Sequence, residues 1–476
     1  MITNGMQRLI AFVVAATLVL AACGGGSGNN VAGIDRTGAP AIASYGTVTA
    51  FGSVVVNGVH YDTSQTRFVI DGDTGTQADL SVGDVVLVNG TLDSGGATGA
   101  ATTVWFDHNV EGPVTAIDLV ASTAVVLGQL VRVSADTSFD AGIQPAALSG
   151  LAVGDVIEVS GLVQGDDSIN ATRIGRRPPG AGGEYEVTGV VVGTQVGLHT
   201  FFLGAIFVNY SVAVVSGVAG SVVANGQHVR VKGTFGDHGV LVASRVDYLS
   251  NALGGASGER REVEGVITRF ASATDFSLGL LSVTTTAQTS YEGGTAADLG
   301  LNVKVEVEGT LSASGKLVAT KIDVRRSAPV RMVASVDSVD IAANSFVALG
   351  VTVNVDALTR LEDQSSLHVL PFSLANLAAG DNVEVRGTES PTGSGRLLAT
   401  LVERTGAQQD TELQGFVQSI TRPLFAILGV QITTNTGTQF EGVSGLAQLA
   451  VGDLVKVSGQ KLGDRALSAT QVEVDD

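Results

Sequence analysis

The sequence predicts an all-β protein built from about six tandem copies of one small, barrel-like module. Three observations support this fold class. A strand that ends in glycine recurs along the 476 residues, and its apolar and polar residues alternate with a period of two. Glycine is abundant, with 62 residues, and charged residues make up only 15% of the chain. Because 44% of the residues are hydrophobic, the composition is that of a folded chain and not of a disordered one.

The first residues resemble the signal peptide of a bacterial lipoprotein. Arg8 precedes an apolar run, 9–20, that only Thr17 interrupts. As a helix this run would reach about 18 Å, which is too short for a bilayer core of about 30 Å, so residues 1–22 are predicted to be a signal peptide. The run ends in Leu20-Ala21-Ala22-Cys23, which resembles a lipobox and implies that Cys23 is lipidated and becomes the new N-terminus. The alternative is an ordinary signal peptide with an incidental cysteine, but Cys23 is the only cysteine in the chain.

Residues 23–43 are predicted to be the lipidated cysteine and a flexible Gly/Ser/Asn tether. In lipoproteins an Asp directly after the cysteine usually signals retention at the inner membrane, and in this chain that residue is Gly24. The resemblance therefore implies an outer-membrane protein that is held by its N-terminal lipid. Whether it faces the periplasm or the cell surface stays open.

The repeat is marked by a strand whose final glycine returns every 71 to 78 residues. These glycines are Gly90, Gly161, Gly233, Gly309, Gly387 and Gly459. In the fourth copy Val303, Val305 and Val307 alternate with Lys304, Glu306 and Glu308, so the valines are expected to face a core and the charges the solvent.

Each copy carries the same order of elements around this strand. A strand broken by a glycine comes first, then in several copies a Thr-x-aromatic step, a short Leu/Ala segment such as 374–377, the Gly-terminated strand, and a last strand opened by Ala-Thr or Ala-Ser. The Leu/Ala segment is expected to form a helical turn at most. Five strands with a turn before the fourth indicate a small OB-like β-barrel. A small β-sandwich is the alternative, although about 70 residues are few for two complete sheets.

The copies divide the mature chain into six modules. Their predicted limits are 44–107, 108–177, 184–249, 261–326, 329–405 and 411–476. Modules one and two, and modules four and five, are almost contiguous, so those pairs are expected to be held rigidly.

The signal peptide, the Cys–Gly/Ser tract and the repeated Val-Gly-Asp-x-Val-x-Val-x-Gly module together resemble a family of Gram-negative lipoproteins. The repeated domain of that family is one of unknown function, so the resemblance implies no activity. Copy three, with Asn225-Gly226-Gln227, and copy four, with Gly300-Leu301-Asn302, depart from the Gly-Asp step.

The charge and the motifs argue against several classes of function. Acidic residues outnumber basic ones 46 to 27, and aromatic residues are only 5%, so nucleic-acid binding is not expected. The six histidines have no ligand spacing, and Asp71-Gly72-Asp73-Thr74-Gly75 fails as a calcium loop and is expected to be a solvated turn. The chain has no nucleophile elbow or P-loop. We therefore expect no catalytic residue, no metal, no cofactor and no enzyme.

The remaining candidates are structural or binding residues. The aspartates of the Gly-Asp steps are expected to cap local backbone N–H groups; they are Asp84, Asp155, Asp381 and Asp453. Arginines gather at module ends and are expected in solvated linkers or, alternatively, in ion pairs between modules; they are Arg173, Arg176, Arg177, Arg260, Arg261, Arg325, Arg326 and Arg331. Trp105, the only tryptophan, is a weak candidate for binding and is otherwise filler between modules one and two.

The function expected from the sequence is a non-enzymatic binding or structural role in the cell envelope, with a protein or glycan as a possible partner. The alternative is a periplasmic protein that binds oligosaccharides or cations, and behind it a hydrolase with an unrecognised site. The ligand and the oligomeric state stay open.

Overall fold

The computed structural model describes residues 40–474 except 52, 120, 135, 178–182, 237–238, 250–252, 254, 326–328, 370 and 408–409. The predicted signal peptide, Cys23 and nearly all of the predicted tether lie outside the described residues. In the part that is described, no helix is both long enough and apolar enough to cross a bilayer.

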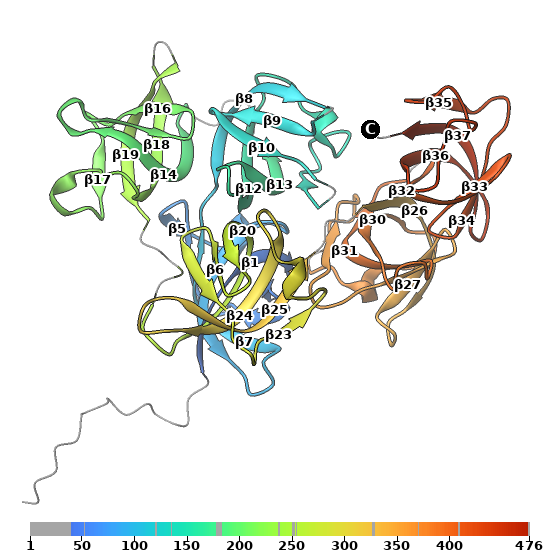
Figure 1. Cartoon of the computed structure of the whole chain (residues 1–476). Coiled ribbons are helices and arrows are strands. Elements are labelled where there is room, and N and C mark those ends of the chain that lie inside the picture. Colours follow the sequence, from blue (N-terminus) through green and yellow to red (C-terminus); the bar gives the residue numbers. More distant parts are fainter. Residues whose placement is uncertain are drawn as a thin grey trace, which may run out of the picture. The chain divides into compact units, whose positions relative to one another are not determined.

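The described residues form six small β-barrels, which follow one another along the chain (Figure 1). We call them barrels 1 to 6, and they span residues 41–106, 110–176, 185–248, 260–325, 330–405 and 411–474. Barrel 1 contains, in chain order, β1 (Ala41–Ala50), β2 (Val54–Val56), β3 (Val59–Asp62), β4 (Arg67–Ile70), β5 (Asp73–Gly75), η1 (Gln77–Asp79), β6 (Val85–Leu92) and β7 (Thr98–Phe106). Barrel 2 contains β8 (Val110–Asp118), β9 (Thr123–Val126), β10 (Gln129–Arg132), β11 (Ser138–Phe139), η2 (Leu148–Gly150), β12 (Val156–Val163) and β13 (Ile169–Arg176). Barrel 3 contains β14 (Tyr185–Gln195), η3 (Val196–Leu198), β15 (Thr200–Leu203), β16 (Ile206–Asn209), β17 (Val214–Ser216), η4 (Ala219–Ser221), β18 (His228–Phe235) and β19 (Leu241–Tyr248).

The second half of the chain repeats this plan. Barrel 4 contains β20 (Arg260–Ser272), β21 (Asp275–Leu278), β22 (Leu281–Thr284), β23 (Ser290–Glu292), η6 (Ala296–Asp298), β24 (Lys304–Leu311) and β25 (Leu317–Arg325). Barrel 5 contains β26 (Val330–Asp340), β27 (Ser345–Ala348), β28 (Val351–Asn354), β29 (Arg360–Asp363), η7 (Leu374–Asn376), β30 (Asn382–Glu389) and β31 (Arg396–Thr405). Barrel 6 contains β32 (Thr411–Thr421), β33 (Leu424–Ile427), β34 (Val430–Thr433), β35 (Gln439–Glu441), β36 (Leu454–Gly463) and β37 (Ala466–Val474).

The strand order in each barrel is that of an OB-like fold. In barrel 5 the long first strand, β26, pairs with β27 at one end and with β30 at the other. β27 pairs with β28, β28 runs parallel to β31, and β31 pairs with β30, which closes the barrel. The short β29 pairs with β31 beyond β28. The predicted five-stranded barrel with a helical turn before its fourth strand is therefore confirmed, and the sandwich alternative is not.

A backbone requirement explains the Gly-Asp step and its exceptions. The residue before the fourth-strand aspartate has a positive φ, between 93° and 99°, at Gly83, Gly154, Gly380 and Gly452. Glycine adopts this conformation without strain, and asparagine tolerates it better than most residues. Copy three keeps a glycine there, Gly226, and copy four has Asn302 with a φ of 63°. The two departing copies therefore preserve the turn although they lose the aspartate.

The alternation of the Gly-terminated strand correctly predicts the face that points into the core, but not the exposure of the outer face. In barrel 4, Val305 and Val307 are fully buried beside Val263 and Ile267 in the core. Glu306, which was expected to face solvent, is only 6% exposed. The expectation was wrong because the outer faces of these strands lie at a junction with other barrels, where a polar side chain is also withdrawn from water.

The barrels are joined in pairs through the free edge of the first strand. β1 runs parallel to β20, so barrels 1 and 4 share one sheet. β8 pairs antiparallel with β14 and β26 with β32, which joins barrel 2 to 3 and barrel 5 to 6. Strand pairing does not join the contiguous modules, although the backbone N–H of Val85 in barrel 1 donates to Oγ of Ser160 in barrel 2, so their rigidity stays a prediction.

The apolar cores follow this pairing. One buried cluster runs through barrels 5 and 6, and another runs through barrels 2 and 3. Barrels 1 and 4 have separate cores. A small cluster of Val85, Val266 and Leu162, which come from barrels 1, 4 and 2, lies between them with Tyr45 packed against it. The junction between barrels 1 and 4 therefore buries less apolar surface in common than the other two.

Candidate functional site: the charged junctions between barrels

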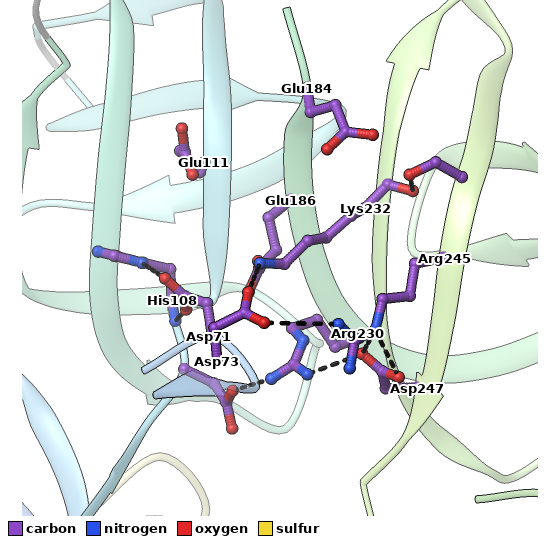
Figure 2. A network of polar contacts seen from close by, with 12 residues as sticks. Asp71, Asp73, His108, Glu111, Glu184, Glu186, Arg230, Lys232, Arg245 and Asp247 are labelled. Atoms are coloured by element: carbon purple, nitrogen blue, oxygen red, sulfur yellow. Dashed lines mark hydrogen bonds and ion pairs between the residues drawn. The ribbon is translucent and has the colours of Figure 1, made fainter. Parts of the chain in front are cut away.

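The polar side chains that the strands turn outward gather at the junctions. On the first strands of barrels 2 and 3, Glu111 lies directly opposite Glu186. Asp71, from the β4–β5 turn, and His108, from the connection between barrels 1 and 2, approach the same place (Figure 2). Arg230 and Lys232 project from β18 toward them. The network therefore draws its charges from three barrels.

Asp71 and His108 form the best-defined pair of this network. The Nδ1 of His108 lies 2.9 Å from Oδ2 of Asp71, and the backbone N–H of His108 donates to Oδ1 over 2.9 Å. Burial alone would lower the pKa of His108, but the hydrogen bond and charge of Asp71, helped by Asp84 and Glu158, outweigh burial and raise that pKa to about 10. The same hydrogen bonds overcome burial at Asp71 and lower its pKa to about 2. At neutral pH this is an imidazolium–carboxylate ion pair, and the ring has no lone pair free to act as a general base.

The two basic residues of β18 neutralise the neighbouring acids. Arg230 bridges Asp107 and Asp247, and its contact with Oδ2 of Asp247 is 2.7 Å long. The Nζ of Lys232 lies 3.4 Å from Oε2 of Glu186 and also contacts Asp73. Asp71, Asp107, Asp247 and Glu186 therefore meet a basic side chain from β18 or from His108, and Glu111 meets Arg177.

Glu186 is the most buried acid of the network. It is 2% exposed, and its Oε1 atom has no hydrogen-bond partner. Burial and the charge of Asp71 raise the pKa of Glu186 to about 9, against the opposing effect of Lys232 and Arg230. Glu186 therefore holds a proton at neutral pH, which reduces the cost of burying it.

Two groups of three carboxylates come close enough to share a cation. One is Asp71, Asp107 and Glu186, and the other is Glu262, Glu306 and Glu308; in each group one oxygen per residue lies within 4.8 Å of the others. The first group already contacts His108, Arg230 and Lys232. In the second, Glu306 pairs with Arg325, Glu308 with Lys321, and Glu262 accepts from Ser44. A metal ion would meet positive charge in both places, so the chemistry favours structural ion pairs, and the absence of a metal site stays a prediction.

The aspartates of the Gly-Asp steps cap backbone N–H groups as predicted. The carboxylate of each accepts from the backbone three residues earlier, at 2.7 to 2.9 Å; the pairs are Asp84 with Ser81, Asp155 with Ala152, Asp381 with Ala378, and Asp453 with Ala450. In copy three the side-chain oxygen of Gln227 accepts from Ala224 over 2.8 Å. These residues are structural.

The arginines at module ends include residues that link barrels, which corrects the expectation of solvated linkers. Arg331 donates to Glu384 of its own barrel over 2.7 Å and also contacts Glu412 of barrel 6. Arg173 lies 3.6 Å from Glu362 of barrel 5. The alternative interpretation, ion pairs between modules, holds for these two.

Asp71 corrects a second expectation. The segment 71–75 was predicted to be a solvated turn, but the Asp71 side chain is only 16% exposed and faces the junction. Trp105 lies on β7, is half-buried, and sits opposite Leu87 and Val69. Its role as a binding residue or as filler stays a prediction.

A cavity of about 730 Å³ also lies between barrels and not inside one. Its walls carry both signs of charge, with Glu264, Lys304 and Arg360 among them, and its lining contains no histidine or cysteine. The network around His108 was missed from the sequence, because its members come from positions 71 to 247 and no local spacing marks them.

Comparison with known proteins agrees with the repeat. No curated protein matches the chain at a meaningful level. One family model matches six times, and its segments cover well over half of the sequence; they are 45–104, 111–175, 209–247, 264–323, 333–403 and 414–473. In copy three the match begins only at the last residue of β16, whereas in the other copies it begins within the first strand. The chain therefore belongs to the family described as Domain of unknown function (DUF5666).

Proposed function

We propose that this protein is a non-enzymatic scaffold of the bacterial cell envelope, which a lipid on Cys23 holds to the outer membrane. The observation that carries the proposal is the pairwise fusion of the barrels by strand pairing, β1 to β20, β8 to β14 and β26 to β32. Modules that only display separate binding sites have no need of shared sheets, whereas a scaffold needs fixed angles between its parts.

The anchor is supported by the residues of the N-terminal segment. The apolar run 9–20 is too short to span a bilayer, and it ends at Leu20-Ala21-Ala22-Cys23. A single acyl chain holds a protein only marginally, while two or more hold it stably, so a fully lipidated cysteine is sufficient as an anchor.

The non-enzymatic part of the proposal is supported by the chemistry of the charged junctions. His108 is paired with Asp71, and its raised pKa keeps the ring protonated well above neutral pH. The ring therefore cannot accept a proton from a substrate. Arg230 pairs with Asp107, and Lys232 contacts Glu186, which already holds a proton. These groups are arranged to hold barrels together and not to exchange protons.

Neither alternative function has an observation of its own. An oligosaccharide-binding protein with repeated sites is expected to expose aromatic residues on the same face of several barrels. Among the described residues, the large exposed aromatics are Phe202, Tyr248 and Phe416, which lie on barrels 3 and 6 only. The two carboxylate groups that could hold a cation already contact basic side chains.

Fractionation of cells that express the whole chain tests the anchor. The wild-type protein is expected in the outer-membrane fraction with a fatty acid attached, and Cys23→Ser should be unprocessed or released into the soluble fraction. Ser27→Ala, four residues further on, is the matched control and should behave as the wild type. A Cys23→Ser protein that matured and stayed in the membrane would refute the anchor.

The scaffold is tested by breaking one junction. Arg331→Ala removes the side chain that links Glu384 to Glu412, while Arg396→Ala removes an arginine that contacts only Asn354 of its own barrel. Partners captured from the native envelope should decrease with the first variant and not with the second. Equal capture by both would mean that the fixed angle between barrels 5 and 6 is irrelevant to function.

A further inference from the structure

Barrel 3 carries a long segment without charge. From Val187 to Val229 the sequence contains no Asp, Glu, Lys or Arg, although 15% of the whole chain is charged. This segment supplies β14 beyond its second residue, β15, β16 and β17. The outer surface that these strands present can therefore be only apolar or neutral.

Apolar side chains are exposed along this segment. Val192 on β14 lies opposite Phe202 on β15, which lies opposite Phe207 on β16 with 5.0 Å between the ring centroids. The turn that joins β14 to β15 adds Val196 and Leu198, and Leu198 is 66% exposed. We call these five residues the apolar hairpin face.

A second turn extends this face at the same end of the barrel. The ring of His199, next to Leu198, packs against Tyr210 at 5.4 Å, and the backbone N–H of Tyr210 donates to the carbonyl of His199. Two residues further on, Val212 is among the most exposed apolar side chains of the described chain. The tip of barrel 3 therefore projects aliphatic side chains from two adjacent turns.

Barrel 4 does not share this surface, whereas barrel 2 has an apolar row, Ala116, Val125 and Leu130, at the same cross-strand positions. In barrel 4 the corresponding cross-strand pair is Arg269 with Ser277, and Arg269 also forms an ion pair with Asp275. The family match in copy three omits residues 185–208, which contain the hairpin face. The apolar hairpin face of barrel 3 therefore lies in the segment where that barrel departs from the family.

We propose that the apolar hairpin face of barrel 3 rests on the bilayer as a second, non-covalent membrane contact beside the lipid anchor. The proposal rests on the proposed function, since it needs a membrane close by. Residues 24–39 can reach at most about 55 Å when extended, which is about two barrel diameters, so an anchored chain keeps its barrels within reach of the lipid.

The chemistry of the face fits lipid better than a second copy of this chain. Projecting valine and leucine side chains enter a fluid interface without a matching groove, whereas a rigid partner must supply one. With a net charge of −19, the rest of the surface is repelled by anionic lipid, so the uncharged face is the one that can approach a membrane.

The test uses residues 23–476 with Cys23→Ser, so that no acyl chain contributes. This protein is floated with vesicles of pure phosphatidylcholine, and the bound fraction is expected to rise with lipid concentration. Leu198→Glu combined with Val192→Glu should lower the partition coefficient at least tenfold. The matched control, Leu462→Glu combined with Val153→Glu, places two charges at sites that are each 64% exposed on barrels 6 and 2, and it should bind as the parent does.

Three results would overturn the proposal. The first is that the parent chain does not float with the vesicles, and the second is that the control variant loses as much binding as the test variant. The third is that binding is lost between 50 and 500 mM salt, because binding through an uncharged face should be insensitive to salt. Concentration-dependent dimerisation that Leu198→Glu abolishes, without vesicle binding, would assign the face to a second copy instead. Since the vesicle assay contains no lipidated cysteine, its outcome is independent of whether Cys23 is the anchor in cells.

Discussion

The junction between barrels 5 and 6 and the junction between barrels 1 and 4 use the same strand edge with opposite electrostatics. In the first, Arg331 lies between Glu384 and Glu412, and Arg386 and Arg331 overcome burial and lower the pKa of Glu384 to about 2. In the second, Glu262 lies beside Ser44 with Glu306 and Glu308 nearby, and burial together with these charges raises the pKa of Glu262 to about 8. The 5–6 junction therefore has Arg331 between two acids, while the 1–4 junction combines a matched pair, Lys304 with Glu264, with an acid, Glu262, that keeps its proton.

The apolar packing also differs between the two junctions. A single core runs through barrels 5 and 6, whereas barrels 1 and 4 keep separate cores with a small bridge between them. Strand pairing alone therefore does not determine how firmly two barrels are held. We expect barrels 5 and 6 to open as one unit, and barrels 1 and 4 to separate when the charges at their junction change.

The largest effect is expected from removing the central arginine of the first junction. Arg331→Ala leaves Glu384 buried with only Arg386 and leaves Glu412 without its partner across the junction. Only Glu384 is fully buried, at 6% exposed, while Arg331 and Glu412 are about a quarter to a third exposed, so the loss should stay below the roughly 3–5 kcal/mol that breaking a fully buried pair costs. Hydrogen exchange of residues 330–334 and 411–415 in the whole chain should report this loss, and Arg396→Ala should leave their protection unchanged. Unchanged protection in Arg331→Ala would mean that the shared core alone holds the pair.

The second prediction is a pH dependence of the 1–4 junction that rests on Glu262 and Glu306. The pKa of Glu262 is raised to about 8 and that of Glu306 to about 7, from an ordinary value of 4.5. The folded state binds more protons than the unfolded state in this range, so stability is fully present below about pH 4.5 and is lost as the pH rises through 7 to 8. Between pH 5 and pH 8.5 the 1–4 junction should lose on the order of 2–4 kcal/mol.

Hydrogen exchange of residues 42–45 and 260–263, corrected for the intrinsic rate at each pH, measures this dependence. Glu262→Gln keeps the side chain's size and removes the ionisation, so most of the pH dependence should disappear. Residues 330–334 and 411–415 of the 5–6 junction serve as the internal reference. An equal pH dependence in both junctions would contradict the assignment to Glu262 and Glu306.

The third prediction concerns how far a core defect spreads. Val305 in barrel 4 and Val455 in barrel 6 occupy the same position of the repeat, and both are fully buried. Truncating either to alanine should cost about 1–3 kcal/mol through lost transfer energy and a cavity. Because the 5–6 core is continuous, Val455→Ala should reduce protection in barrels 5 and 6, while Val305→Ala should affect barrel 4 and leave barrel 1 as it was. Spread of the Val305→Ala defect into barrel 1 would show that the small bridge is sufficient to couple the cores.

The sequence predicts the barrel well and the junctions poorly, for a physical reason. Period-2 alternation and the glycine with positive φ are local properties, so the fold and the capping role of residues such as Asp84 follow from them. The alternation shows which side chains point into the barrel and which point out of it, but not whether an outward side chain meets solvent or a neighbouring barrel. Glu306 was therefore expected to face solvent, although it is only 6% exposed. The free edge of the first strand is available in every copy, so no local signal says that barrel 1 joins barrel 4. The uncharged segment from Val187 to Val229 is visible in the sequence, but its meaning depends on knowing that its side chains are exposed.

The smallest effect should come from an ion pair at the rim of the 5–6 junction. Lys461 of barrel 6 contacts Asp337 of barrel 5, and both side chains are about a quarter exposed. A pair so accessible to water and salt should couple by only about 0.5–1 kcal/mol. A double-mutant cycle with Lys461→Met and Asp337→Asn measures that coupling as the change in protection of residues 330–334, and it should shrink when salt is raised from 50 to 500 mM. The reference is the Arg269–Asp275 pair in a hairpin of barrel 4, which joins no two barrels and should couple less. A coupling for Lys461 as large as the loss in Arg331→Ala would place the strength of the junction at its rim, and the buried arginine would then serve to select the partner strand and not to hold it.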